Sequence, residues 1–535
     1  MKWADLLQRE GLNVAVFPTG YGKTTAILHA GLKNARVIHV LPLQAIVSQL
    51  AERLSANGFD VCYQMGLTVP GVCKSPFLAA LYNVVTLDSF VLNLFGVPVF
   101  ELFRDVWHSD VAWLLASYAD IIIFDEYHLM VAPDGDGEDV VKVHTTVKFA
   151  VEALRKRRLA RRVLILTATI TPSMIASLNP DGVWIYAPEG HRYVDAVRRE
   201  LGNGSRVHVV PPSDKFGEEM QKKLKGVKFK EVNSKSGCGG KVKYPDLGHL
   251  VNSGVYVAVN SWRRATLLWE DLQEASMSNF SKPASILLLH AKLDVDSRRE
   301  LTKRLGEGGA LVATQVVEAG VDVSFKKLLT EPAPAFSIIQ RTGRVARRPE
   351  SPPGGEVIVL RTDYEAWRGV YDGDLTRKTE KLLEQHDNIN WKVPVNNGYD
   401  YLQLILDLDD AVGRKIGERD RDVEAFLEYL DRYVGKPGDA LRWLDKRGGS
   451  LLRSSTLFTG VYDGRVFVLD VYTLSRLGDR LKIKKRDGEG VVDVEKLKER
   501  PLETIKRLQL QEVYVTNVKM LTMGGLQTYT LDPCI

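Results

Sequence analysis

Cysteine is scarce in this chain of 535 residues, which has only four: Cys62, Cys73, Cys238 and Cys534. No two of them form a Cys-x-x-Cys pair, the spacing that many structural zinc sites use. The sequence therefore predicts neither a zinc ribbon nor a disulfide framework.

Long apolar runs are absent as well. No uninterrupted apolar stretch reaches the roughly 18 residues that a membrane-spanning helix needs. Met1–Glu10 lacks the basic start and apolar middle of a secretory signal. With 45% hydrophobic and 26% charged residues, the composition is that of a globular protein. We therefore expect a cytoplasmic protein of about two to four domains that has no membrane partner.

The net charge of +5 is unevenly distributed along the chain. Counting Lys and Arg against Asp and Glu, residues 1–195 carry −2, residues 196–360 carry +8 and the remainder carries −1. The positive middle third indicates a surface that binds phosphates, although a solvated basic face would give the same count.

Short apolar runs alternate with amphipathic segments, such as Gln44–Ala56, in the first third of the chain. Five runs are typical of buried strands: Val14–Phe17, Arg36–Leu41, Asn83–Leu87, Asp120–Phe124 and Arg162–Thr167. The pattern returns in five further segments: Gly254–Asn260, Ala284–His290, Ala310–Thr314, Lys327–Thr330 and Glu356–Leu360. Such alternation predicts two tandem α/β lobes, each with a parallel sheet covered by helices on both faces.

The expected organisation has four parts. They are a first lobe at 1–195, a basic linker or insertion at 196–253, a second lobe at 254–360 and an α+β accessory region at 361–535. The linker is inferred from Asp214–Lys243, which is rich in lysine and has little apolar periodicity. In the accessory region, Val423–Val434 predicts an amphipathic helix, and Asp463-Gly464 and Gly524-Gly525 predict hairpin turns.

The segment Phe17-Pro-Thr-Gly-Tyr-Gly-Lys-Thr24 lies between an expected strand and the expected helix Thr25–Lys33. A phosphate-binding loop needs glycines that let backbone N–H groups turn inward, a lysine that neutralises charge and a hydroxyl for magnesium. These parts are supplied by Thr19, Gly20, Gly22, Lys23 and Thr24. The segment therefore predicts a site for the phosphates of ATP, with Mg²⁺ as cofactor.

Two carboxylates follow the apolar run Ile121–Phe124, in Asp125-Glu126-Tyr-His128. Open α/β sheets place their ligands at the carboxyl ends of strands. There Asp125 could hold magnesium, and Glu126 could orient the attacking water. His128 would contact the nucleotide side or the other lobe. Adjacent acidic residues at a strand end are common, so this prediction depends on the phosphate loop that precedes them.

Thr167 and Thr169 follow another expected strand. Their hydroxyls would relay hydrogen bonds between the acidic pair and the second lobe, although a plain turn would have the same sequence. In the second lobe, Arg344 and Arg347 have the i, i+3 spacing of one helix face. Arginines so placed can stabilise charge on a γ-phosphate in the transition state, but a basic helix is more often a solvated face.

In this order and at these separations, the motifs of roughly residues 12–350 resemble those of superfamily 2 helicases with an Asp-Glu-x-His signature. The resemblance implies two RecA-like lobes with an ATP site between them. It assigns catalytic roles to the following residues: Lys23, Asp125, Glu126, Arg344 and Arg347. It adds nucleotide contacts from Gly320, Asp322 and Gln340. It assigns contacts with the nucleic-acid backbone to a further group: Leu43, Gln44, Thr86, Asn260, Ser261 and Thr314.

Two departures from the family pattern concern the nucleotide. The strict phosphate-loop pattern has glycine where this chain has Phe17, and Gln8 lies too close to Lys23 to be an adenine-reading glutamine. Base selectivity for ATP is therefore not assigned by the sequence.

Three segments are most similar to the helicase of CRISPR-associated type I interference: Phe124–Leu129, Ala313–Asp322 and Ile339–Arg347. This resemblance implies movement on single-stranded DNA from 3′ to 5′, after an RNA-guided CRISPR surveillance complex has opened the target. Many family members carry a His-Asp nuclease domain before the phosphate loop. The only His-Asp dipeptide here is His386-Asp387. The chain thus resembles the split form, whose expected partner is a separate His-Asp nuclease subunit.

Two other functions fit the same motifs. A repair or RNA-remodelling helicase would share the motor and differ in the accessory region, which has no recognised motif. An ATP-dependent clamp would bind nucleic acid without moving along it. Glu126, Arg344 and Arg347 argue against the clamp, because a module that only binds nucleotide does not need hydrolytic residues.

Overall fold

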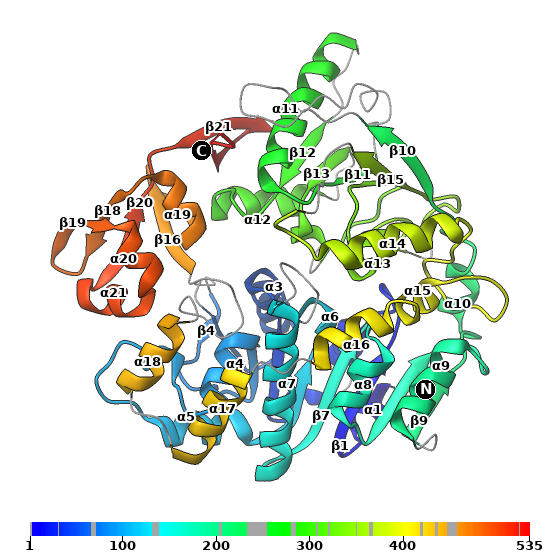
Figure 1. Ribbon diagram of the computed structural model, residues 1–535, viewed down its shortest axis with the longest axis horizontal. Helices are drawn as coiled ribbons and strands as arrows, with labels where there is room; N and C mark the ends of the chain where they lie inside the picture. The colour runs from blue at the N-terminus through cyan, green and yellow to red at the C-terminus, as the bar shows by residue number, and fades with distance from the viewer. Residues whose placement is uncertain are drawn as a thin grey trace. The chain divides into compact units, whose positions relative to one another are not determined.

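The fold is that of a computed structural model of the whole chain (Figure 1). The described residues are 3–29, 31–65, 71–130, 138–202, 206–232, 254–279, 285–305, 309–318, 322–348, 350–362, 368–417, 421–433, 437–446, 457–523 and 525–534. The chain divides into two compact units. Unit 1 comprises Met1–Lys222 and Arg377–Ala440, and unit 2 comprises Lys223–Thr376 and Leu441–Ile535. The predicted pair of parallel-sheet α/β lobes with an α+β C-terminal region is confirmed.

Unit 1 is built on a nine-stranded sheet in which every neighbouring pair is parallel. Its strands, in spatial order, are β4 (Cys73–Lys74), β3 (Val61–Gln64), β5 (Tyr82–Thr86), β2 (Val37–Leu41), β6 (Ala119–Phe124), β7 (Ala160–Thr167), β1 (Gly11–Val16), β8 (Gly182–Tyr186) and β9 (Val207–Val210). The central strands are almost completely buried, as both faces of a parallel sheet require. All the carboxyl ends of the strands therefore lie at one edge.

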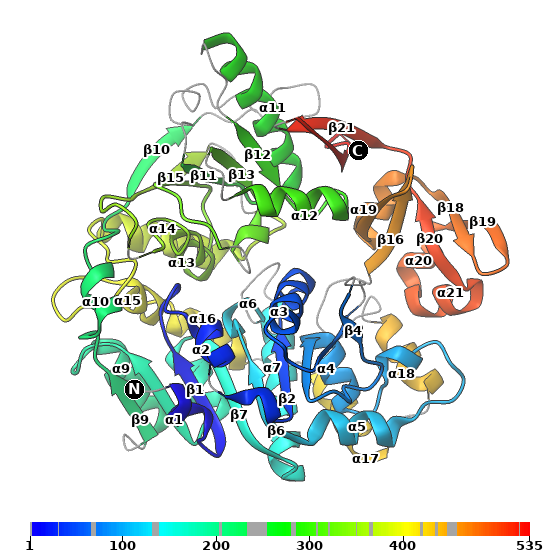
Figure 2. The same cartoon turned by 180° about the vertical axis from the view of Figure 1, so that it is seen from behind.

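Helices cover this sheet. They are α1 (Trp3–Leu7), α2 (Lys23–His29), α3 (Gln44–Ala56), α4 (Leu87–Leu94), α5 (Ser109–Ser117), α6 (Tyr127–Met130), α7 (Glu138–Arg157), α8 (Pro172–Leu178), α9 (Arg192–Leu201) and α10 (Lys215–Met220). Helix α3 packs on β3 and β5, whereas α7 packs on β7 and against α4 (Figure 2). The sequence prediction of α3 agrees with the structure at both ends.

Residues beyond the second lobe return to unit 1. They form α15 (Tyr401–Leu406), α16 (Asp409–Gly417) and α17 (Arg421–Tyr433), and the last two lie along α7 (Figure 1). A buried pair fixes this segment, because His191 Nε2 lies 2.8 Å from Asp400 Oδ2 and both side chains are inaccessible to solvent. Asp409 also accepts a hydrogen bond from the Ser173 hydroxyl at 2.6 Å. The expected accessory region 361–535 is thus divided between the two units.

Unit 2 contains a second parallel sheet. Its strands, in spatial order, are β10 (Lys228–Val232), β15 (Glu356–Thr362), β14 (Lys327–Thr330), β11 (Val255–Ala258), β13 (Ala310–Ala313) and β12 (Ile286–Leu289). Its helices include α11 (Trp262–Asn279), α12 (Val295–Arg304) and α13 (Ala335–Thr342), and α14 (Gly373–Gln385) follows. Part of the lysine-rich segment expected as a linker is ordered, because α10 begins at Lys215 and β10 pairs with β15. Residues 233–253 lie outside the described residues.

The remaining part of unit 2 is a five-stranded sheet with its own core. After α18 (Pro437–Lys446), its strands are β16 (Leu457–Tyr462), β17 (Arg465–Asp470), β18 (Arg480–Lys485), β19 (Gly488–Asp493) and β20 (Leu510–Tyr514). Its helices are α19 (Val471–Leu477), α20 (Val494–Glu499) and α21 (Pro501–Leu508). Both hairpin predictions are confirmed, at the β16–β17 turn and in the pair β21 (Val518–Met523) and β22 (Leu526–Leu531).

This accessory part is attached to the second lobe through residues that follow β12. Lys292 Nζ lies 2.6 Å from Asp470 Oδ2 at the end of β17. The buried Asp294 caps α12 and accepts a hydrogen bond from the Tyr529 backbone N–H at 3.1 Å. Charge pairing and capping therefore tie the second sheet to the accessory part.

The prediction that the cysteines form no disulfide is wrong. Cys62 and Cys73 lie directly opposite one another on the paired strands β3 and β4, with their Cα atoms 4.5 Å apart, and they form a disulfide. The sequence could not show this, because only strand pairing brings the two positions together. Cys238 lies outside the described residues. Among the helices that the structure describes, none is both long and apolar enough to cross a membrane.

Candidate functional site

The predicted phosphate loop joins β1 to α2. Gly20 and Gly22 have φ values of 82° and 85°, in the left-handed region that favours glycine. Lys23 is 6% exposed, and its Nζ donates to the carbonyl oxygens of Phe17 at 3.1 Å and Pro18 at 3.2 Å. The lysine is therefore folded over its own loop, with its charge directed at oxygen acceptors. The side chain of Thr24 lies outside what the structure describes.

The acidic pair follows β6, which is separated from β1 by β7 alone. Asp125 is 1% exposed, and its Oδ1 accepts a hydrogen bond from the Glu126 backbone N–H at 2.9 Å. Glu126 itself has a φ of 53°, which is uncommon for a residue with a side chain. Such backbone strain costs about 1–3 kcal/mol and concentrates at functional sites. The backbone conformation of Glu126 therefore fits the role that the sequence predicts for it.

Asp125 is ionised despite being buried. Burial raises its pKa, but a hydrogen bond from His39 and the charges of His39 and Lys23 outweigh burial and hold the pKa below the usual value. An ionised carboxylate oxygen is the kind of ligand that Mg²⁺ prefers, and Mg²⁺ needs few protein ligands because it keeps several waters. The residues present therefore fit a magnesium ion, with Asp125 as its ligand.

His128 and Thr167 connect the ends of β6 and β7. His128 is 1% exposed, and its Nδ1 lies 3.3 Å from the Thr167 hydroxyl and 3.7 Å from Glu126 Oε2. The Thr167 hydroxyl in turn donates to the carbonyl oxygen of Thr169 at 2.8 Å. Within unit 1, the structure thus brings the predicted threonines next to the predicted acidic pair.

Tyr21, inside the phosphate loop, was not predicted to have a role. Its hydroxyl donates to Asp214 at 2.7 Å, and the Tyr186 hydroxyl donates to the other oxygen of the same carboxylate at 2.6 Å. Asp214 also caps α10 through the backbone N–H of Gly217. The phosphate loop is therefore tied to the beginning of α10. In the sequence, the position of Tyr21 between the two loop glycines was the only feature that indicated such a contact.

The residues predicted to hold nucleic acid in unit 1 lie after neighbouring strands. Leu43 and Gln44 are half-buried at the beginning of α3, after β2. Thr86 ends the adjacent strand β5, and its hydroxyl donates to Ser89 at 3.0 Å. All three therefore lie at the same edge of the sheet as the phosphate loop.

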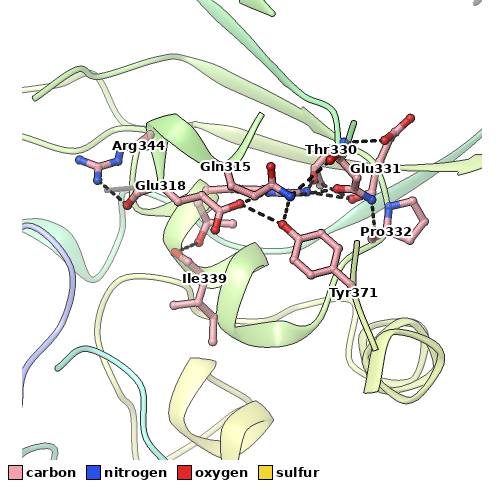
Figure 3. Close-up of polar contacts among 11 residues, drawn as sticks. Gln315, Glu318, Thr330, Glu331, Pro332, Ile339, Arg344 and Tyr371 are labelled. Carbon is pink, nitrogen blue, oxygen red and sulfur yellow. Dashed lines mark hydrogen bonds and ion pairs between the residues drawn. The ribbon is translucent and has the colours of Figure 1, made fainter. Parts of the chain in front are cut away.

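In unit 2, the predicted residues surround an arginine that the sequence did not single out. Arg341 is fully buried, and each of its five N–H groups has an acceptor. The acceptors are Glu318 Oε1 at 2.8 Å, the Thr330 hydroxyl at 2.8 Å, the Glu331 carbonyl at 3.2 Å, Asn260 Oδ1 at 3.0 Å and the Tyr371 hydroxyl at 2.8 Å. Figure 3 shows Glu318, Thr330, Glu331 and Tyr371 in this group of polar contacts.

Asn260 belongs to the same network. Its side-chain N–H donates to the Pro332 carbonyl at 2.8 Å and its backbone N–H to Glu331 Oε2 at 2.7 Å. The residue is 2% exposed, so its side chain orders the ends of β11 and β14 from inside the lobe. Ser261 follows it and is half-buried, and Thr314 is buried at the end of β13.

The prediction that Arg344 and Arg347 share a helix face is wrong, because α13 ends at Thr342. Beyond it the chain pairs with Phe325, whose backbone N–H donates to the Arg344 carbonyl and whose carbonyl accepts from Ala346. This bridge follows two turn hydrogen bonds, which the N–H groups of Arg344 and Val345 donate to the carbonyl oxygens of Arg341 and Thr342.

The guanidinium groups of the two arginines have different surroundings. Arg344 is 6% exposed and donates to the Glu318 carbonyl at 2.6 Å, whereas Arg347 pairs with the exposed Asp322 at 3.3 Å. Gln340 is 4% exposed, and Gly320 lies outside the described residues.

Two family models match this chain. Residues 3–178 match the DEAD/DEAH box helicase, and residues 252–350 match the C-terminal part of CRISPR-associated nuclease/helicase Cas3. The first match contains the phosphate loop, the acidic pair and Thr167. The second contains the Arg341 network apart from Tyr371. Family matches and candidate site thus coincide in both units.

Curated relatives carry the same names. The chain is 24% identical over 413 residues to CRISPR-associated nuclease/helicase Cas3 of Methanothermobacter thermautotrophicus, covering 70% of this chain and 43% of that protein. It is 25% identical over 414 residues to CRISPR-associated helicase Cas3 of Thermoproteus tenax, covering 72% and 61%. The chain therefore spans less than two thirds of either relative.

A solved structure agrees at the level of the fold. The crystal structure of T. fusca Cas3-ADP has a TM-score of 0.57 and 18% sequence identity, covering 99% of this chain and 68% of that one.

Proposed function

We propose that this chain, which is homologous to the Cas3 helicases, is an ATP-driven motor that moves on single-stranded DNA. The observation that supports this most strongly is the convergence of the phosphate loop, Asp125, Glu126 and Thr167 at the ends of the adjacent strands β6, β7 and β1. Open α/β sheets bind ligands at this edge. Because these residue types are those that phosphoryl transfer to water requires, the site fits ATP hydrolysis.

Each candidate site residue has a defined part in the proposed reaction. Lys23 exchanges its contacts with the loop carbonyls for the phosphate oxygens, and the backbone N–H groups of the glycine loop bind the same phosphates. Asp125 would hold magnesium, which would supply positive charge next to the phosphates. Glu126 accepts a hydrogen bond from the attacking water and orients it. Arg344 and Arg347 are the candidates for stabilising the transition state.

Single-stranded DNA is the proposed track, with movement from 3′ to 5′. Leu43, Gln44 and Thr86 lie at the same sheet edge of unit 1 as the phosphate loop, so backbone contacts there could respond to the nucleotide. The positive charge of residues 196–360 favours a phosphate-rich partner. Ser261 and Thr314 are the corresponding candidates in unit 2.

Single-stranded DNA is expected to stimulate ATP hydrolysis more than RNA of equal length. ATPase rates are measured while each nucleic acid is titrated, and the titration is repeated at several salt concentrations. The apparent affinity should fall steeply with salt, since phosphate contacts release counterions. Equal or greater stimulation by RNA would instead support an RNA-remodelling helicase, and ATP-dependent binding without strand separation would support a clamp.

We further propose that this activity belongs to CRISPR interference, because both curated relatives are named as CRISPR-associated Cas3 proteins. The proposed partners are an RNA-guided surveillance complex and a separate nuclease. We expect the chain alone to unwind DNA without cutting it. His386 directly follows α14, and its ring stacks on the ring of Tyr399, with the two ring centroids 3.8 Å apart. Such packing fits a structural role for the His386-Asp387 dipeptide.

Incubation of purified protein with single-stranded DNA, ATP and magnesium, manganese or nickel tests this expectation. Full-length DNA should be recovered, and cleavage should appear when a His-Asp nuclease from the same locus is added. Metal-dependent cleavage by the chain alone that is lost in His386→Ala would contradict the proposal.

A further inference from the structure

Three buried polar side chains form a row that ends at Asp125, the first residue of the acidic pair. Tyr82, His39 and Asp125 come from β5, β2 and β6, which are adjacent in the sheet. Their exposed fractions are 2%, 0% and 1%. The Tyr82 hydroxyl lies 3.0 Å from His39 Nδ1, and His39 Nε2 lies 3.3 Å from Asp125 Oδ2. Polar groups so deeply buried are costly unless they are paired, so this row is specified by the fold.

The middle side chain of the row joins the other two. An ionised Asp125 carboxylate can only accept, so His39 Nε2 is the donor in that contact. Burial raises the pKa of the Tyr82 hydroxyl, which keeps its proton and lies within hydrogen-bonding distance of His39 Nδ1. The His39 ring is therefore held by Tyr82 on one side and donates to Asp125 on the other.

We propose that His39, oriented by Tyr82, is a positioning residue that holds the Asp125 carboxylate in the orientation needed to bind the metal ion of the nucleotide. This inference rests on the proposed role of Asp125 in ATP hydrolysis. It assigns the row a function beyond filling the interior of the sheet.

Both oxygens of Asp125 are restrained in this arrangement. The Glu126 backbone N–H donates to Oδ1, and His39 on the adjacent strand β2 contacts Oδ2. Rotation of the carboxylate would break both hydrogen bonds inside a buried site, where the loss is not compensated by water. Partners that orient metal ligands in this way usually contribute about 10–100-fold to metal affinity.

The test compares three substitutions in the complete chain. His39→Met keeps an unbranched side chain of similar length but donates nothing. His39→Gln keeps an N–H group in place of Nε2, and Tyr82→Phe removes only the hydroxyl that orients the ring. The probe is Mn²⁺, titrated in the presence of a non-hydrolysable ATP analogue and followed by the electron paramagnetic resonance signal of free Mn²⁺. Circular dichroism and thermal unfolding report on folding.

His39→Met is expected to weaken Mn²⁺ binding about 10–100-fold, His39→Gln to restore most of it, and Tyr82→Phe to give an intermediate loss. The Mg²⁺ concentration for half-maximal ATPase should rise in the same order, with kcat recovering at saturating Mg²⁺. If His39 and Tyr82 served only to pack the interior, the substitutions would lower thermal stability, but Mn²⁺ affinity would not follow the order expected for the three variants.

Asp125→Asn separates this inference from the proposed function. If Asp125→Asn bound Mn²⁺ as the parent does, the metal site itself would be misplaced. If Asp125→Asn lost the ion while folded His39→Met kept parental affinity, only the role of His39 would be overturned. Should His39→Met not fold, Tyr82→Phe decides. Weaker Mn²⁺ binding in Tyr82→Phe than in His39→Gln would support the inference, whereas parental affinity in both variants would overturn it.

Discussion

Replacing Lys23 by alanine or Glu126 by glutamine is expected to lower kcat for ATP hydrolysis by about 10²-fold or more. Lys23→Ala removes the buried cation that would neutralise the phosphates, so nucleotide affinity should fall as well. Glu126→Gln replaces the charged carboxylate that would polarise the attacking water with a neutral amide, but it leaves the phosphate loop intact. It should therefore bind ATP with parental affinity and accumulate as a nucleotide complex.

Steady-state ATPase assays and binding of a fluorescent ATP analogue separate these two effects. Glu189→Gln is a matched control, because this glutamate is 69% exposed and pairs only weakly with Arg198, at 3.5 Å. It should hydrolyse ATP at the parental rate. A folded Glu126→Gln variant with parental kcat would show that another group orients the water, and the left-handed conformation of Glu126 would need a different explanation.

Sequence patterns were sufficient for the elements that carry the motifs. The apolar run Lys327–Thr330 agrees with β14 at both ends, and the ends of Gln44–Ala56 agree with α3. These predictions succeed because a buried parallel strand must be apolar on both faces and an amphipathic helix must repeat every 3.6 residues. The order of phosphate loop, acidic pair and threonines then follows, since parallel strands place all their carboxyl ends at one edge.

Other elements lacked such a signature. Strand β10 is the lysine-rich run Lys228–Val232, whose charged residues indicated a linker. It lies at the edge of its sheet, where only one neighbouring strand supplies hydrogen bonds and charged side chains remain in water. The disulfide between Cys62 and Cys73 likewise depends on the pairing of β3 with β4, which no local pattern reports.

Buried polar residues were the hardest to interpret from the sequence. His39 lies in the apolar run Val37–Leu41, and Arg341 lies beside the two arginines that received catalytic predictions. Spacing alone cannot separate an arginine that holds a lobe together from one that meets a phosphate. Only the hydrogen-bond partners make this distinction, because Arg341 has five acceptors inside unit 2 whereas Arg347 is paired at the surface with Asp322.

Replacing Arg341 by methionine is therefore expected to destabilise unit 2 by about 3–5 kcal/mol, the usual cost of removing one partner of a buried ion pair. The substitution would leave the Glu318 carboxylate, which is 3% exposed, without its nearest cation. It would also release the Thr330 hydroxyl and Asn260, so the ends of β11 and β14 and the beginning of the loop after α13 should open together. Burial lowers the pKa of the Arg341 guanidinium, but Tyr371 and Glu318 raise it by more than burial lowers it. The pKa is therefore above its usual value, and the group stays charged in the folded lobe.

Amide hydrogen exchange measured by mass spectrometry localises this effect. Peptides from residues 255–262 and 327–345 should exchange much faster in Arg341→Met, while peptides from β1 and β6 should be unchanged. Arg347→Ala is the control, since its side chain is 23% exposed and its loss should alter stability by no more than about 0.5 kcal/mol. Adding Glu318→Gln to Arg341→Met should recover part of the stability, because the uncompensated charge is then removed. If Arg341→Met exchanged like the parent, the network would not hold the lobe together, and Arg341 would have to be considered for catalysis alongside Arg344.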